Sequence, residues 1–142
     1  MLTMINGAGG RIGRSVAYEL LKQKDSSDKE SHLKIVAINE PRGIDFVVEN
    51  YKSRDSVHGL YSWDVCKKDK NTITINEHPI AFYSNKNIQD IPFKKEGIEL
   101  VLECSGYFGD PKIKDKSIEL KPKDNLSNAF LTQGVKKVIQ TY

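Results

Sequence analysis

Four apolar runs, separated by polar segments, dominate the pattern of this chain; they cover residues 2–5, 33–38, 98–103 and 135–139. They are continuous rather than alternating, as in strands that are buried on both faces of a parallel sheet. Apolar positions at helical spacing predict one helix over residues 13–24, and a second helix is expected over residues 44–51. The alternation of strand and helix predicts an α/β fold with a doubly wound, mostly parallel sheet.

Two shorter runs, residues 72–75 and 80–83, predict a small β-hairpin that turns at residues 76–79. Residues 110–128 are rich in Lys, Asp and Ser, and we expect a surface loop with a weak helix there. A length of 142 residues fits one domain with a real core.

Residues 6–14 read Asn-Gly-Ala-Gly-Gly-Arg-Ile-Gly-Arg and lie between the first predicted strand and the first predicted helix. Gly7, Gly10 and Gly13 are spaced by three, and Gly9 is an extra member. Glycines allow a sharp turn and a close approach of the backbone, and a helix N-terminus favours negative charge. The segment therefore predicts a cradle for a pyrophosphate; the alternative is a glycine-rich surface turn.

Ligands of such a sheet bind at the carboxyl ends of its strands. Three segments begin where an apolar run stops: the glycine loop, Asn39-Glu40-Pro41 and residues 104–108. Their agreement is stronger evidence for a site than the glycines alone.

Glu40 stands 33 positions after Gly7, since 40 − 7 = 33. An acidic residue at the end of the second strand accepts hydrogen bonds from the adenosine ribose of NAD and repels the 2′-phosphate of NADP. We therefore expect NAD rather than NADP as cofactor, although Arg42 lies two residues further on and softens that repulsion. The alternative for Glu40 is a solvated turn residue.

The net charge of +3 is too mild to indicate nucleic acid as a partner. Two distant cysteines, Cys66 and Cys104, indicate neither a metal site nor a disulfide framework, so a cytoplasmic location is the default expectation. No apolar run approaches the ~20 residues that span a bilayer, so no membrane partner is expected.

The chain resembles the NAD-binding half of phosphorylating glyceraldehyde-3-phosphate dehydrogenases, and it is similar to their relative, erythrose-4-phosphate dehydrogenase. The resemblance rests on the joint order of Ile5-Asn6-Gly7, Arg11-Ile12-Gly13-Arg14, Val36-Ala37-Ile38-Asn39-Glu40, Asp55-Ser56-Val57-His58-Gly59, Glu103-Cys104-Ser105-Gly106-Tyr107-Phe108 and Gly134-Val135-Lys136-Lys137-Val138-Ile139. These motifs run from the first residues to the last. The resemblance implies oxidation of a sugar-phosphate aldehyde with hydride transfer to NAD, a reaction of glycolysis, in a homotetramer.

The resemblance also implies a set of cofactor-binding residues. Around the pyrophosphate it places Asn6, Gly7, Gly10, Arg11, Ile12 and Gly13; around the adenosine it places Asn39, Glu40, Pro41, Lys86 and Phe108. Ser105 and Gly106 match the pair that lines the cofactor cleft, and Thr141 falls near the nicotinamide.

Three departures from the family pattern bear on function. The glycine loop is one residue longer, the 110–128 segment is longer, and the chain stops at Tyr142. The family reaction uses a cysteine thiolate and a histidine base, and the family segment Ser-Cys-Thr-Thr-Asn-Cys is not in this sequence. We expect residues 1–142 to be an incomplete dinucleotide-binding domain without its catalytic domain, with no catalytic residue and no metal site. Cys104 is expected to be a buried or cleft-wall thiol.

Other interpretations stay open on the sequence alone. A non-catalytic module that binds NAD and acts through a partner would carry the same motifs. The glycine loop is also similar to that of dihydrodipicolinate reductases, but the segments around His58, Ser105 and Lys137 speak against that interpretation. A nucleic-acid role based on scattered lysines is the weakest.

Overall fold

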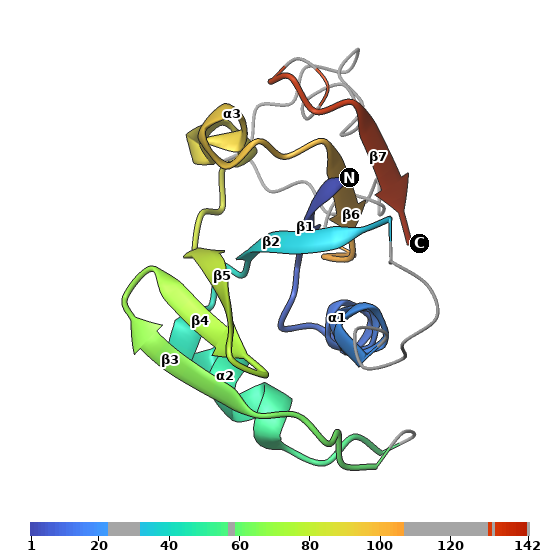
Figure 1. Ribbon diagram of the computed structural model, residues 1–142, viewed down its shortest axis with the longest axis vertical. Coiled ribbons are helices and arrows are strands. Elements are labelled where there is room, and N and C mark those ends of the chain that lie inside the picture. Colours follow the sequence, from blue (N-terminus) through green and yellow to red (C-terminus); the bar gives the residue numbers. More distant parts are fainter. Residues whose placement is uncertain (23–31, 57–58, 107–130, 132, 142) are drawn as a thin grey trace.

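The computed structural model describes residues 1–22, 32–56, 59–106, 131 and 133–141 (Figure 1). In chain order its elements are β1 (Leu2–Asn6), α1 (Arg11–Lys22), β2 (Lys34–Asn39), α2 (Ile44–Lys52), β3 (Val65–Asp69), β4 (Thr72–Ile75), β5 (His78–Tyr83), the 3-10 turn η2 (Ile88–Asp90), α3 (Phe93–Glu96), β6 (Leu100–Glu103) and β7 (Lys137–Gln140). The predicted 110–128 loop lies outside the described residues.

The described residues form one sheet of seven strands in the order β3-β4-β5-β2-β1-β6-β7. The pairs β5-β2, β2-β1, β1-β6 and β6-β7 are parallel, whereas the pairs β3-β4 and β4-β5 are antiparallel. The predicted α/β fold, with a mostly parallel sheet and an added hairpin, is confirmed. Because β2 follows β1 on one side and β6 joins β1 on the other, the strand order reverses at β1, which is where open α/β sheets bind ligands.

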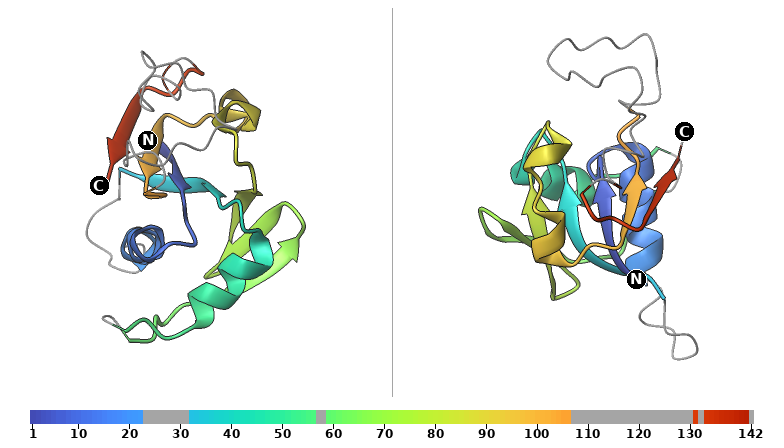
Figure 2. Two further views of the ribbon diagram at one scale, coloured as in Figure 1. Left: turned by 180° about the vertical axis from the view of Figure 1, so that it is seen from behind. Right: turned by 90° about the horizontal axis from the view of Figure 1, so that it is seen from above.

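Helices and turns cover both faces of the sheet. Neighbouring residues of a strand point to opposite faces, so Ile5 of β1 joins the core under α1 and α2, while Met4 joins a second core with Phe93 of α3. Figure 1 and the left view of Figure 2 show α1 and α2 on one side of the sheet and α3 on the other. Coverage of both faces explains why the strands of the sheet centre read as continuous apolar runs.

The structure corrects several predicted boundaries. Helix α1 begins at Arg11 rather than at residue 13, so the glycine turn leads directly into the helix. The strands β6 and β7 begin two residues later than predicted. Ile98 and Val135 precede them and are buried in the second core without belonging to a strand. An apolar run predicts which residues are buried, but burial alone does not determine the residue at which strand pairing begins.

The antiparallel part of the sheet was the least predictable. The predicted four-residue turn at 76–79 is wrong, because Asn76 and Glu77 alone make the turn, both with positive φ (48° and 66°). A two-residue turn with positive φ at both positions matches the right-handed twist of a hairpin. Strand β3 was not predicted: Val65 is its only buried residue, and such an edge strand has no apolar pattern to detect.

Candidate functional site

The carboxyl ends of five parallel strands form one edge of the sheet, and the predicted site residues lie along it. Asn6 ends β1, Asn39 ends β2, and Ser105 and Thr141 follow β6 and β7. Asn39 also exchanges two hydrogen bonds of 2.9 Å with the backbone of Asn85, next to Lys86. The fold therefore brings together predicted residues from across the whole chain. Phe108 lies outside the described residues.

Two glycines of the loop are required by close backbone contacts. A Cβ on Gly7 (φ +78°) would lie 2.4 Å from Cα of Ser105, and a Cβ on Gly13 would lie 2.2 Å from the Gly7 carbonyl oxygen. Gly7 therefore lets the backbone that follows β1 lie close to the backbone that follows β6. Gly13 lets helix α1 pack closely onto the glycine turn. The N–H groups of Gly7 and Ala8 donate to the carbonyl of Asn39, which ties the turn to β2.

The extra residue of the glycine loop is held in place by side chains from outside the loop. The N–H of Gly9 donates to Oε2 of Glu40 (3.0 Å), and its carbonyl accepts from Nδ2 of Asn50 (2.6 Å). The buried hydroxyl of Tyr51 donates to the carbonyl of Ala8 (2.8 Å). Burial raises the pKa of Tyr51, so its hydroxyl stays protonated and remains a donor. The glycine loop is therefore a fixed part of the site.

Glu40 is buried and pairs with Arg42 at the end of β2. Nε of Arg42 lies 2.8 Å from Oε1 of Glu40, and the Arg42 guanidinium lies over the ring of Phe46 at 4.0 Å. Burial acts to raise the pKa of Glu40, but the hydrogen bonds and charge of Arg42 and the N–H of Gly9 more than offset it. The pKa of Glu40 is therefore lowered, and the side chain is a carboxylate. Glu40 was predicted to accept hydrogen bonds from a ribose, and in the structure its carboxylate also holds the glycine loop through the N–H of Gly9.

A buried polar network lies beneath this edge of the sheet. Nδ2 of Asn39 donates to Oδ1 of Asn6 (2.7 Å), and Nδ2 of Asn6 donates to Oε2 of Glu103 (2.6 Å). The N–H of Ser105 donates to the other Glu103 oxygen (2.7 Å). The network links the ends of β2, β1 and β6, so it sets the positions of the three segments that were predicted from the sequence.

We expect Glu103 to make the free energy of unfolding fall as the pH rises above its ordinary pKa of 4.5. Burial raises the pKa of Glu103 above that value, so the native state holds its proton longer than the unfolded chain does. Stability from this group is greatest below 4.5 and declines through its raised native pKa. Urea unfolding at a series of pH values should show this slope in the native chain and lose it in Glu103→Gln; equal slopes would contradict the assignment.

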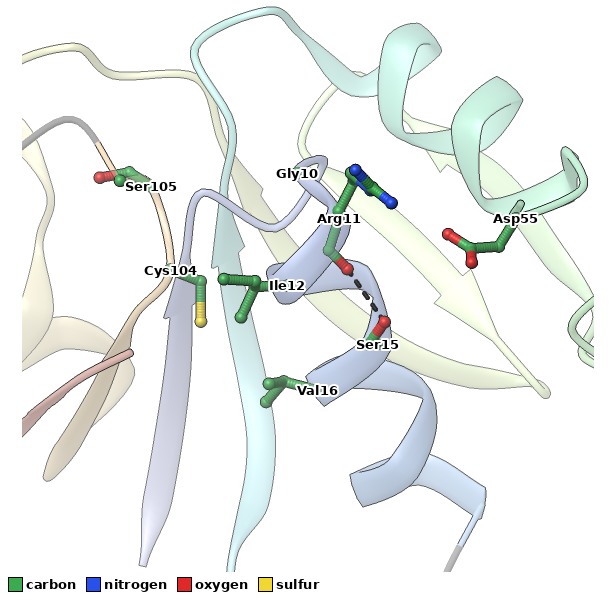
Figure 3. Close-up of a pocket in the computed structure, with 9 residues that line it drawn as sticks. Gly10, Arg11, Ile12, Ser15, Val16, Asp55, Cys104 and Ser105 are labelled. Atoms are coloured by element: carbon green, nitrogen blue, oxygen red, sulfur yellow. Dashed lines mark hydrogen bonds between the residues drawn. The ribbon is translucent and has the colours of Figure 1, made fainter. Parts of the chain in front are cut away.

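A pocket of about 650 Å³ opens at the point where the strand order reverses (Figure 3). Its lining comprises Gly10, Arg11, Ile12, Ser15, Val16, Asp55, Cys104, Ser105 and Gly106. Figure 3 shows the first turn of α1 on one side and the end of β6, with Cys104 and Ser105, on the other. N–H groups of a first helical turn have no intrahelical acceptors, so this pocket suits an anionic group.

A buried ion pair stabilises the side of the pocket that Asp55 lines. Arg14 of α1 pairs with Asp55, and its guanidinium also donates to the carbonyl of Asn50 (2.7 Å). Because Asp55 is paired, its charge is largely balanced where it borders the pocket. Arg14 therefore connects α1, α2 and the pocket wall.

The two cysteines differ in environment. Cys104 is buried, and burial raises its pKa to about 11, so it is a neutral thiol near pH 7. The prediction of a buried or cleft-wall thiol is confirmed. Cys66 is exposed on β3. Among the described residues, no group of three or more His, Cys, Asp or Glu side chains is placed to hold a metal ion.

Sequence reasoning missed several residues that build the site. Glu103 carried a signal, because a charged residue that closes a buried apolar strand needs partners. Asp55 was noticed only as part of a motif, and Asn50 and Tyr51 as part of a helix. Their roles depend on α2 packing beside the glycine loop, a contact between segments about 40 positions apart.

Comparison with known proteins identifies the family. Residues 1–111 match the family model of the NAD-binding domain of glyceraldehyde 3-phosphate dehydrogenase. The chain belongs to this family. The resemblance seen in the sequence is thereby confirmed, and the NAD-binding domain of the family supports NAD as the cofactor.

Three curated relatives show the extent of the similarity. The chain is 34% identical over 140 residues to the cytosolic glyceraldehyde-3-phosphate dehydrogenase of Pisum sativum, covering 95% of this chain and 34% of the relative. It is 35% identical over 130 residues to that of Chlamydia pneumoniae (91% and 36%) and 36% identical over 140 residues to that of Atriplex nummularia (95% and 32%). The chain thus spans about a third of the length of these relatives. In the part that the structure describes, no helix is long and apolar enough to cross a membrane.

Proposed function

We propose that this chain is the cofactor-binding part of a phosphorylating aldehyde dehydrogenase of the glyceraldehyde-3-phosphate dehydrogenase type. The observation that carries the proposal is the pocket between the first turn of α1 and the end of β6, at the reversal of strand order. In doubly wound sheets this is the position at which a pyrophosphate meets a helix N-terminus.

The proposal gives each part of the sheet edge a role in holding NAD. Gly10, Arg11 and Ile12 line the pyrophosphate position, and Gly7 and Gly13 shape the turn. Asn6 and Asn39 hold the ends of β1 and β2 in register through their side chains. These contacts orient a dinucleotide along the edge.

The remaining predicted residues are assigned to the two ends of the cofactor. Asn39, Glu40, Pro41, Lys86 and Phe108 are assigned to the adenosine end, and Ser105, Gly106 and Thr141 to the other end. In support, Thr141 contacts the end of β6 through two hydrogen bonds from its N–H and hydroxyl to the carbonyl of Glu103. NAD supplies the hydride acceptor; the residues of this chain bind and orient it, and none is assigned a catalytic role.

We further propose that the full activity belongs to a protein that oxidises a sugar-phosphate aldehyde, as the names of the relatives indicate. On the same basis we propose a place in glycolysis and a cytoplasmic location. We also propose a homotetrameric assembly, which rests on the family resemblance of the sequence.

Isothermal titration with NAD tests the proposed site directly. The chain is expected to bind NAD, and Arg11→Glu is expected to weaken binding about tenfold or more, because a negative charge is placed where the pyrophosphate meets the helix. Lys34→Glu makes the same charge change at the amino end of β2, the opposite edge of the sheet, and should leave binding unchanged. Absence of NAD binding at millimolar concentration, or equal losses in the two variants, would contradict the proposal.

A further inference from the structure

The carboxylate of Glu40 is fully occupied by donors from this chain. It accepts from the N–H of Gly9 (3.0 Å), the N–H of Arg42 (3.2 Å), Nε of Arg42 (2.8 Å) and Nη2 of Arg42 (3.1 Å). A carboxylate offers about four acceptor positions. A ribose hydroxyl can therefore reach this carboxylate only by displacing one of these donors.

The partner of Glu40 is the outer member of the pair. The side chain of Arg42 is 54% exposed, whereas that of Glu40 is 3% exposed. A guanidinium carries five N–H donors, and Glu40 takes one from Nε and one from Nη2. The Arg42 guanidinium is held over Phe46, so its unused donors are presented on a fixed plane at the carboxyl end of β2.

We propose that Arg42 forms a binding position for the 2′-phosphate of NADP, so that this chain binds NADP as well as NAD. The inference rests on the proposed function, which places the adenosine ribose at this end of β2. A free carboxylate there repels a 2′-phosphate, and a nearby arginine accommodates it. In this structure the carboxylate is neutralised by Arg42 and buried behind it, so the group that a 2′-phosphate meets is a cation with free donors.

Paired titrations of the intact 142-residue chain with NAD and NADP test this inference. We expect the two dissociation constants to lie within about tenfold of each other. In Arg42→Ala, NADP affinity is expected to fall roughly ten- to hundredfold, as for loss of hydrogen bonds to a charged group. NAD affinity should be unchanged or slightly improved, because Glu40 is then free to accept from the ribose. Lys34→Ala, at the opposite edge of the sheet, should change neither affinity.

The outcomes separate the inference from the proposed function. If the native chain binds NAD but rejects NADP, the inference fails and the proposed function stands; if it binds neither, the proposed function fails. Equal losses for both cofactors in Arg42→Ala would make Arg42 a structural residue and overturn its role. Should that variant not fold, adenosine 2′,5′-bisphosphate and 5′-AMP titrated into the native chain decide the question. Tighter binding of the bisphosphate supports the position, and equal or weaker binding overturns it.

Discussion

Replacing Gly13 with alanine is expected to lower the free energy of unfolding by roughly 3 kcal/mol, the upper range for overpacking a core. In a helix, this substitution normally stabilises by about 1 kcal/mol. Here the new Cβ would lie 2.2 Å from the Gly7 carbonyl oxygen and 2.9 Å from Cα of Ala8. Both are backbone atoms of a turn that β2 and Tyr51 hold in place, so they have little freedom to move away.

Gly10→Ala is the matched control for this prediction. It makes the same change in the same loop, but its Cβ would meet the Gly7 carbonyl oxygen at 3.4 Å, an ordinary contact. We expect a change within about 1 kcal/mol for Gly10→Ala in urea unfolding. Similar losses in both variants would show that the close packing of α1 on the turn is not what requires Gly13.

Asp55→Ala is expected to destabilise the chain by about 3–5 kcal/mol, the range for removing one partner of a buried ion pair. Asp55 and Arg14 have side chains that are both only 5% exposed. Nε of Arg14 is already without a hydrogen-bond partner among the described residues. Without Asp55 the Arg14 charge remains buried. Among the described residues it then keeps its hydrogen bonds to Asn50 and Ser53 and its position 5.3 Å from the centre of the Tyr61 ring, none of which carries a compensating negative charge.

Lys67→Ala provides the comparison for the ion-pair prediction. It removes the exposed pair between Lys67 and Asp45, whose side chains are 41% and 83% exposed, and should cost at most about 1 kcal/mol. The double variant Arg14→Leu with Asp55→Ala should be more stable than Asp55→Ala alone, because no unpaired charge is then buried. Equal stabilities of Asp55→Ala and Lys67→Ala in urea unfolding would contradict the role of the buried pair.

The glycine loop shows how far local sequence reaches. Its spacing between an apolar run and a helical pattern indicated a phosphate-binding turn, and the ends of the neighbouring apolar runs indicated where the rest of the site would lie. That inference depends only on alternating strands and helices, since parallel strands bring their carboxyl ends to one edge. The central sheet, the main helices and the family could accordingly be recognised in the sequence.

Glu40 is a residue whose role could not be predicted from the local sequence. From the sequence, Glu40 was expected to accept hydrogen bonds from a ribose, and Gly9 was noted as an extra glycine in a loop that was expected to cradle a pyrophosphate. In the structure the two residues meet, because the N–H of Gly9 donates to the Glu40 carboxylate. A hydrogen bond between residues 31 positions apart leaves no periodic trace in a sequence.

The sequence by itself determined the class of fold, the edge of the sheet that carries the candidate site, and the family of this chain, because these follow from the periodicity of burial and from short motifs. The tertiary structure alone decided which polar groups remain free at that edge. The packing of α2 beside the loop commits Glu40, Asn50 and Tyr51 to holding the turn and leaves Arg42 facing outward. Partner choice among buried polar groups is set by three-dimensional proximity and desolvation, and neither is written in local spacing.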